Sequence, residues 1–188
     1  MNKLFASFAL AAVITAPAIA ADTYAIDPFH TFPTFEANHM GFSTQRGRFD
    51  KTSGTITLDR AAKKGSVELV IETASLNMGL PLWNEHMAVE GFFNTAKYPT
   101  ITFKSNKLVF EGDKVVAAEG DFTLLGVTKP IKLAVNNFKC GPNPMNQKEM
   151  CGADISTTIK RSDFGMTKYL PGIGDEVKLS SPVEAYKQ

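Results

Sequence analysis

Residues 66–73 read Ser-Val-Glu-Leu-Val-Ile-Glu-Thr, and apolar and polar side chains alternate along them. In an extended chain Val67, Leu69 and Ile71 point to one face, and the two glutamates point to the other. A repeat of two residues is typical of a β-strand that has one buried face and one face in water. This stretch therefore predicts a strand that covers a hydrophobic core on one side.

The same alternation recurs along most of the chain. Residues expected on the buried faces of further strands are Ile101, Phe103, Leu108, Phe110, Phe122, Leu124, Ile131, Leu133, Val135, Ile155, Ile159, Val177 and Leu179. Turn-forming sequences separate these stretches, for example 111–113 and 126–130. Short strands at such regular spacing predict an all-β barrel or sandwich rather than alternating strands and helices.

Residues 81–98 depart from this pattern, because their apolar side chains are spaced three and four apart. We expect one short helical segment around residues 82–94. It should end before Tyr98-Pro99, since a proline disfavours a helical conformation in the residue before it.

The first twenty residues are typical of a secretory signal peptide. Lys3 is followed by an uncharged apolar run over 4–16, and Ala18-Ile19-Ala20 offers a cleavage site with small residues. A membrane-spanning helix needs about 20 apolar residues, so an uncleaved anchor is disfavoured. We therefore expect residues 1–20 to be removed and residues 21–188 to form one domain in the periplasm.

The charge of the chain excludes some partners. It has 20 basic and 19 acidic residues, and removal of Lys3 with the signal peptide leaves 19 of each. The basic residues are scattered, so we predict no nucleic-acid partner, no attraction to an anionic membrane surface and no stable membrane insertion.

Two cysteines, Cys140 and Cys151, flank a loop that contains Gly141 and Pro142. In an oxidising compartment they are expected to form a structural disulfide, worth about 3 kcal/mol for a loop of this length. A metal or redox role is the alternative, but the sequence has no CxxC motif and no histidine nearby.

A series of motifs, in this order, resembles the YceI family. They are Ile26-Asp27-Pro28, His30-Thr31, His39, Gly41, Gly47-Arg48-Phe49, Phe92-Phe93-Asn94, Tyr98-Pro99, Ile101 with Phe103, Gly120-Asp121-Phe122-Thr123-Leu124-Leu125-Gly126-Val127-Thr128-Lys129-Pro130 and Arg161-Ser162-Asp163-Phe164-Gly165-Met166. The resemblance implies an antiparallel, closed, lipocalin-like β-barrel that is exported and encloses a polyisoprenoid, an isoprenoid quinone or another long amphiphile. It also implies a homodimer, and it implies no required cofactor.

The pattern and the resemblance together indicate the residues of a ligand site. The expected cavity wall is Phe35, Phe49, Leu69, Ile71, Phe103, Phe122 and Leu124, and the expected lid or wall is Trp83, Met87, Phe92 and Phe93. Polar contacts to a headgroup are expected from His39, which shares a strand face with Phe35, and from an Arg161–Asp163 pair near the mouth. The alternatives are ordinary core packing, a structural histidine and a solvated turn.

Two other functions remain open at this stage. A hydrolase or metal-dependent enzyme would use His30, His39 or His86, but the sequence has no nucleophile elbow or HExxH motif, so we predict no catalytic and no metal-binding residues. A structural barrel filled by its own side chains would share every strand feature described above. The twelve Phe and six Met residues that follow residue 20 suit either an apolar cavity or a filled core.

Overall fold

The computed structural model describes residues 21–188, and the predicted signal peptide, residues 1–20, lies outside the described residues. The strands, in chain order, are β1 (Asp22–Ile26), β2 (Thr34–His39), β3 (Ser43–Phe49), β4 (Thr52–Asp59), β5 (Lys64–Glu72), β6 (Leu76–Asn77), β7 (Thr100–Glu111), β8 (Lys114–Leu124), β9 (Val127–Pro142), β10 (Glu149–Lys160) and β11 (Ile173–Lys187). One α-helix, α1 (Pro81–Ala88), and two short 3-10 helices, Thr73–Ser75 and Arg161–Phe164, complete the described elements.

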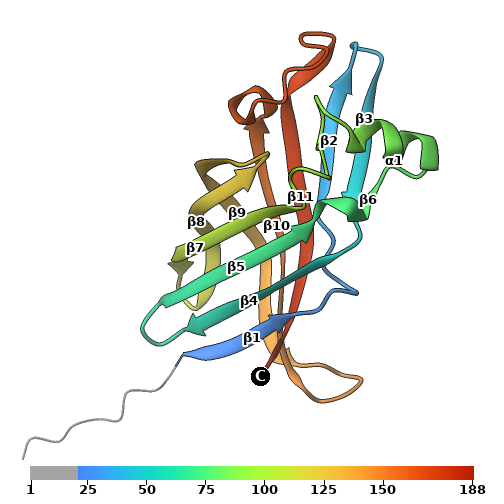
Figure 1. Ribbon diagram of the computed structural model, residues 1–188. Helices are drawn as coiled ribbons and strands as arrows, with labels where there is room; N and C mark the ends of the chain where they lie inside the picture. The colour runs from blue at the N-terminus through green and yellow to red at the C-terminus, as the bar shows by residue number, and fades with distance from the viewer. Residues whose placement is uncertain (1–20) are drawn as a thin grey trace, which may run out of the picture.

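Eight of these strands form a closed antiparallel barrel. The hydrogen-bonded order is β1-β4-β5-β7-β8-β9-β10-β11, and β11 pairs back with β1. In Figure 1, β1, β4, β5 and β7 run side by side across the lower part of the molecule, and β10 and β11 stand behind them. Closure leaves the ring without a free edge. The predicted all-β, closed antiparallel barrel is confirmed.

Three further strands, β2, β3 and β6, extend the wall of the barrel at one end. The edge of β11 pairs first with β2, through Ile173–Ser180, and then with β1, through Ala185–Lys187. Likewise β3 pairs with β2, and β4 pairs with β1, while β6 continues from the end of β5 and pairs with β3. Pro33 lies directly before β2, at the end of the 27–33 break, where a missing N–H removes no ladder hydrogen bond.

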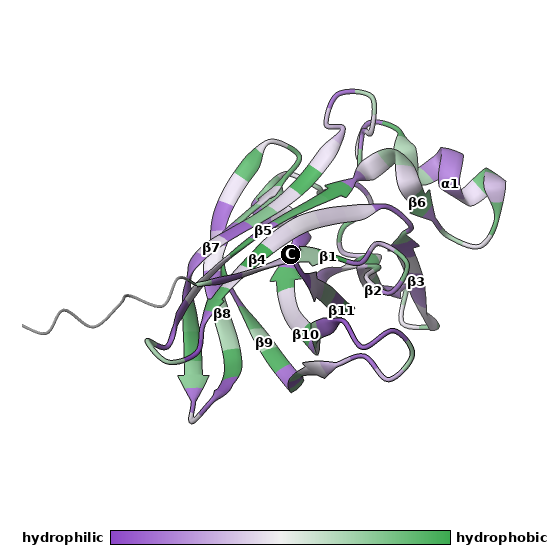
Figure 2. Cartoon of the chain, turned by 90° about the horizontal axis from the view of Figure 1, so that it is seen from below, coloured by the Kyte–Doolittle hydropathy of each residue, from purple (hydrophilic) through white to green (hydrophobic). Residues whose placement is uncertain are grey.

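Burial along the strands follows the alternation of the sequence. On β5, Leu69 and Ile71 are buried, whereas Glu68 and Glu72 are exposed. Figure 2 shows the same alternation of hydrophobic and hydrophilic residues on other strands of the barrel. One apolar core therefore occupies the inside of the barrel, and the charged residues of the strands face outward.

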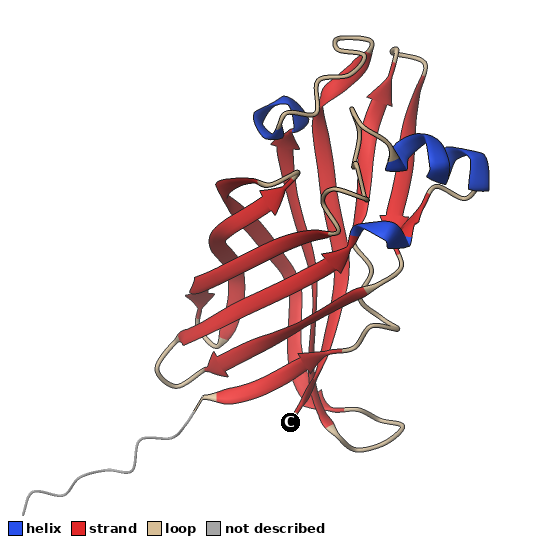
Figure 3. Ribbon diagram, in the orientation of Figure 1, coloured by secondary structure: helices blue, strands red, loops and turns tan. Residues whose placement is uncertain are grey.

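The helix is shorter than predicted. It begins at Pro81 and ends at Ala88, because Val89 is extended and Gly91 adopts a left-handed conformation with φ of 91°. Residues up to Tyr98 continue as turns. No residue of α1 is buried, and the helix lies on the outside of the barrel, next to β6 (Figure 3).

A disulfide joins Cys140 and Cys151, which confirms the predicted pairing. The two residues face each other across the β9–β10 ladder. The bond therefore ties together the two strands that precede and follow the loop at 143–148. Within residues 21–188, no helix has the length and apolarity that crossing a membrane requires.

Candidate functional site

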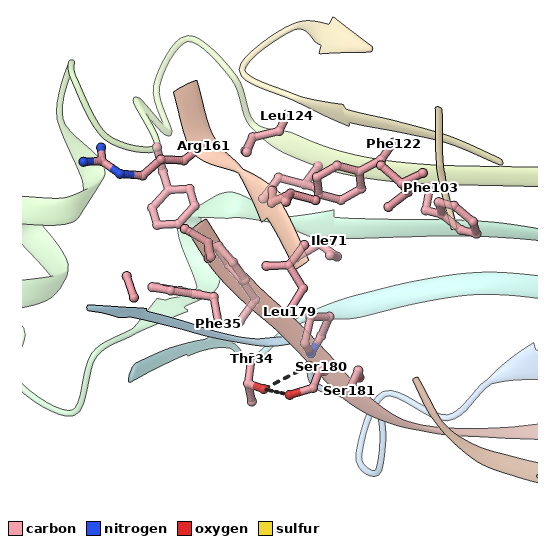
Figure 4. Close-up of a pocket in the computed structure, with 18 of the residues that line it drawn as sticks. Thr34, Phe35, Ile71, Phe103, Phe122, Leu124, Arg161, Leu179, Ser180 and Ser181 are labelled. Carbon is pink, nitrogen blue, oxygen red and sulfur yellow. Dashed lines mark hydrogen bonds between the residues drawn. The ribbon is translucent and has the colours of Figure 1, made fainter. Parts of the chain in front are cut away.

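A cavity of about 130 Å³ lies inside the half of the barrel nearest α1, and its wall is almost wholly apolar. Most of the residues expected in the wall or lid do border this cavity. They are Phe35, Phe49, Leu69, Ile71, Met87, Phe92, Phe93, Phe103, Phe122 and Leu124. Figure 4 shows side chains from β2, β5, β7 and β8 converging on the same space. The alternating strands thus bring inward-facing residues from all round the ring to one apolar surface.

Three phenylalanines pack together at the α1 end of this cavity. The ring of Phe93 lies 5.3 Å from that of Phe35 and 5.2 Å from that of Phe49, measured between centroids, and the contact with Phe49 is edge-to-face. Gly47 on β3 leaves room for this cluster, because a β-carbon there would overlap the Phe35 ring and the sulfur of Met78. The glycine of the Gly47-Arg48-Phe49 motif is therefore a packing requirement of the cavity wall.

A second cavity of about 90 Å³ continues toward the opposite end of the barrel. Leu69, Phe103, Leu133 and Ile155 border both cavities, so they lie between the two. The sequence placed Leu133 and Ile155 on buried strand faces but did not single them out as site residues. Together the cavities form an elongated, two-part apolar space along the barrel.

Tyr24 closes part of the second cavity. It is 1% exposed, and its hydroxyl donates a hydrogen bond to Glu149 Oε1 at 3.3 Å. Burial raises the pKa of Tyr24, and the nearby Glu149 carboxylate raises it further. Lys187 Nζ lies 3.5 Å from Glu149 Oε2 and 2.8 Å from Asp22 Oδ1. This end of the barrel is therefore capped by a charged network in which the Tyr24 hydroxyl stays protonated.

A few hydroxyl groups interrupt the apolar wall of the first cavity. The Thr34 hydroxyl donates to the Ser180 carbonyl at 3.0 Å and lies 2.8 Å from the Ser180 hydroxyl (Figure 4). The Ser181 hydroxyl donates to the Pro182 carbonyl at 2.6 Å. The hydroxyls of Thr34, Ser180 and Ser181 already have partners within the protein, so this part of the wall offers few free hydrogen-bonding groups to a ligand.

Arg161 borders the cavity, but its guanidinium serves the backbone. Figure 4 shows this group pointing away from the aromatic side chains. It donates four hydrogen bonds of 2.9 to 3.0 Å to the carbonyls of Met166, Lys168, Ile173 and Gly174. Burial lowers the pKa of Arg161, an effect that the charge of Asp175 partly offsets.

The predicted Arg161–Asp163 pair is wrong. Asp163 is exposed and does not border the cavity, because the 3-10 helix Arg161–Phe164 turns Arg161 and Phe164 inward and leaves Asp163 in water. The carboxylate that faces this region is Asp175. It accepts hydrogen bonds from the backbone N–H of Ser162 at 2.9 Å and from the Ser162 hydroxyl at 2.8 Å, and these bonds lower the pKa of Asp175.

Two further predicted contacts lie outside the cavity. Trp83 is 36% exposed on α1 and packs edge-on against His86, so the tryptophan is separated from the cavity by His86 and Phe92. His39 is the last residue of β2 and pairs with Ile173, and the cavity wall on β2 reaches only to Ala37. His39 shares the strand face of Phe35 and Ala37, but it does not border the cavity, although its cross-strand partner Ile173 does.

The three histidines do not form a common site in the described part of the chain. His30 lies between β1 and β2, His39 ends β2, and His86 lies on α1. Only His30 belongs to a cluster of metal-binding residue types within residues 21–188. The geometry therefore gives no support to an enzyme built from several histidines.

Comparisons with known proteins place this fold in a family. The YceI-like domain model matches residues 24–185. Protein YceI of Salmonella arizonae is 34% identical over 193 residues, and the alignment covers 100% of both chains. The crystal structure of Burkholderia cenocepacia BcnA has a TM-score of 0.73 at 24% identity and covers 85% of this chain and 98% of that one. A polyisoprenoid binding domain from Saccharophagus degradans has a TM-score of 0.62 at 20% identity, covering 88% of this chain and 98% of that one.

Proposed function

This chain belongs to the YceI-like domain family, and on that premise we propose that it binds a long apolar lipid, of isoprenoid or isoprenoid-quinone type, inside its barrel. The observation that carries the proposal is the two-part apolar space between α1 and Tyr24. Its elongated form suits a chain-like molecule better than a compact one. The Saccharophagus degradans neighbour, which is a polyisoprenoid binding domain, supports the same class of ligand.

The physical basis of binding is burial of the hydrocarbon chain. Each methylene group moved from water into an apolar space contributes about 0.8 kcal/mol. A closed barrel provides this surface without exposing unpaired backbone groups to the ligand. Because the wall is almost wholly apolar and the hydroxyls of Thr34, Ser180 and Ser181 are already hydrogen-bonded, affinity should depend on the length of the buried chain more than on its headgroup.

We further propose that the protein acts in the periplasm, as a carrier or store of this lipid, and that it forms a homodimer. The basis for the location is the signal-like sequence of residues 1–20. The mass of the protein purified from a periplasmic extract tests it, since cleavage after Ala20 leaves a chain that begins at Ala21. Sedimentation analysis of the same sample tests the dimer.

The main experiment identifies the ligand directly. The protein is purified without detergent, its mass is recorded under native conditions, and bound molecules are extracted into organic solvent. We expect a reproducible isoprenoid or similar amphiphile at one molecule per chain. A protein that carries no lipid and fails to bind added polyprenol or quinone would instead be a barrel filled by its own side chains, and the proposal would be wrong.

A pair of variants tests whether the lipid occupies both cavities. Ala118 is 4% exposed and borders the second cavity, whereas Ala37 borders the first. Leucine adds three carbon atoms, so Ala118→Leu should displace about three buried methylenes and weaken long prenols about fiftyfold. It should leave short prenols unaffected. Ala37→Leu should weaken long and short prenols alike, and an equal response of both variants would contradict a ligand that extends through the barrel.

A further inference from the structure

Three residues with metal-binding side chains meet on the outside of the barrel, where the break between β1 and β2 crosses β11. They are Asp27 and His30 from the break and Glu184 from β11. His30 Nδ1 lies 2.7 Å from Asp27 Oδ2 and 3.8 Å from Glu184 Oε2. One nitrogen and two carboxylate oxygens therefore lie within 4.8 Å of one another. None of these residues borders the lipid cavity.

Backbone hydrogen bonds hold the three residues in place. The N–H of Asp27 donates to the Glu184 carbonyl at 2.8 Å. On the other side of His30, the Thr31 hydroxyl donates to the same carbonyl at 3.2 Å and accepts from the Glu184 N–H at 3.0 Å. Asp27 Oδ1 accepts from the Phe29 N–H at 2.9 Å, which leaves Oδ2 directed at the cluster. These contacts fix the backbone positions of the three residues, and the hydrogen bond between His30 Nδ1 and Asp27 Oδ2 orients the imidazole toward the carboxylates.

The charge of the cluster favours a cation. The side chain of Asp27 is only 10% exposed, and that of Glu184 is 38% exposed. Within residues 21–188, neither carboxylate forms an ion pair with a lysine or an arginine, although both have His30 within 4.0 Å. Two adjacent carboxylates, one of them nine-tenths buried, therefore lack a permanent positive partner, and a divalent ion would supply one.

We propose that Asp27, His30 and Glu184 bind one divalent transition-metal ion, for which zinc is the best match. Imidazole nitrogen and carboxylate oxygen are zinc ligands at about 2.0–2.2 Å, and three protein ligands leave a fourth position for water. Tetrahedral ligands at that distance lie about 3.4 Å apart. The observed separations bracket this value, so small side-chain rotations bring all three ligand atoms to one ion. Binding displaces the proton shared by His30 Nδ1 and the Asp27 carboxylate to solvent.

The site would fasten the β1–β2 break to β11. Because β1 and β2 pair with different parts of β11, residues 27–33 are the segment that leaves the barrel wall between them. An ion that joins Glu184 to Asp27 and His30 would hold this segment down and stabilise the folded state. The inference does not depend on the lipid-binding proposal, and its failure would leave that proposal unchanged.

Titration calorimetry with zinc chloride, on protein without a histidine tag, tests the proposal. We expect one ion per chain, and at least about tenfold weaker binding in His30→Ala and in Asp27→Asn, since each removes one of three ligands. His39→Ala and Glu176→Gln are matched controls. They lie on β2 and on an exposed position of β11, and both should bind zinc as the unaltered protein does.

Thermal unfolding provides an independent measurement. Zinc at a hundred times its dissociation constant should raise the midpoint by about 5–10 °C in the unaltered protein and in both controls, and much less in the two ligand variants. Unfolding without zinc shows whether each variant is folded. Binding that is absent, or equally strong in His30→Ala, would overturn the site, and an equal rise of the midpoint in every variant would place the ion elsewhere.

Discussion

Replacing Arg161 by methionine tests the most specific structural role in the site. Methionine keeps an unbranched apolar stem of similar length and removes the guanidinium, with its four hydrogen bonds to backbone carbonyls. Those carbonyls belong to residues 166–174, the segment that joins the 3-10 helix Arg161–Phe164 to β11. Met166 and Ile173 of this segment border the first cavity. The substitution therefore loosens one part of the cavity wall.

The size of the effect follows from two opposing contributions. A hydrogen bond to a charged group contributes about 1.5–3 kcal/mol, and four carbonyls lose such a bond. Against this, Arg161 is only 3% exposed, and burying its charged guanidinium costs the folded protein several kcal/mol. The methionine variant does not have this cost. We expect a net loss of about 3 kcal/mol in the free energy of unfolding, or about 10 °C in the thermal midpoint of a chain of this length.

Urea denaturation of three variants separates the effect of the guanidinium hydrogen bonds on stability from the effect of the positive charge. Arg161→Lys keeps the charge but cannot present donors in a planar fork, so we expect it to be nearly as unstable as Arg161→Met. Arg46→Met is the control, because Arg46 is 66% exposed and pairs with Glu36 at the surface. Bound lipid should also dissociate faster from Arg161→Met. If Arg161→Met were within 0.5 kcal/mol of the unaltered protein, on the order of an ordinary surface substitution, the role assigned to these bonds would be refuted.

Three further predictions concern stability. Phe122→Ala should cost about 3 kcal/mol in urea denaturation, at the low end for such a change because one side of the ring faces the cavity, and a loss below about 1 kcal/mol would contradict the packing described. Joint replacement of Cys140 and Cys151 by serine should cost about 3 kcal/mol, measured in the same way, and no loss would mean that the disulfide does not restrict the unfolded chain. Because hydrogen bonds from Ser162 lower the pKa of Asp175, its stabilising effect is fully present above the unfolded-state pKa near 4 and is lost as pH falls through the lower folded-state pKa. Asp175→Asn should therefore reduce the difference in unfolding free energy between pH 7 and pH 3, and an unchanged difference would assign the acid sensitivity to other groups.

The strands and their inward faces were predictable because barrel walls impose a simple rule. Leu69, Phe103 and Leu124 alternate with polar residues on strands that are buried on one side only, so a repeat of two identifies their direction. The pairing of the strands was harder to predict from the sequence. The interruption between β1 and β2 depends on how two segments share the edge of β11, and in the sequence only Pro33 hinted at it.

Three of the residues expected at the site, His39, Trp83 and Asp163, do not border the cavity, for a common reason. Each prediction used a local pattern: the strand alternation for His39, the helical spacing for Trp83 and the motif around Asp163. Such a pattern indicates the direction of a side chain, but it does not indicate which residues border the cavity. His39 does not border the cavity although its partner Ile173 does, Trp83 lies behind His86 and Phe92, and Asp163 turns outward in a short 3-10 helix. Glu184 was missed for the related reason that its neighbours, Asp27 and His30, are distant in the sequence.

Phe92 and Phe93 border the cavity, as expected from the sequence, but a turn places them there and not the predicted helix. Both were expected on the apolar side of a helix, yet the helix ends at Ala88 and has no buried residue. The turn that follows directs the two rings inward, and it is held by hydrogen bonds from the Phe93 N–H to the Met87 carbonyl at 3.1 Å and from the Thr95 N–H to the Ala88 carbonyl at 2.9 Å. The cavity is therefore closed at this end by the turn together with Met87 of α1. If the proposed lipid enters at this end, it has to displace the rings of Phe92 and Phe93 and break the hydrogen bonds of the turn, while the barrel strands can stay paired.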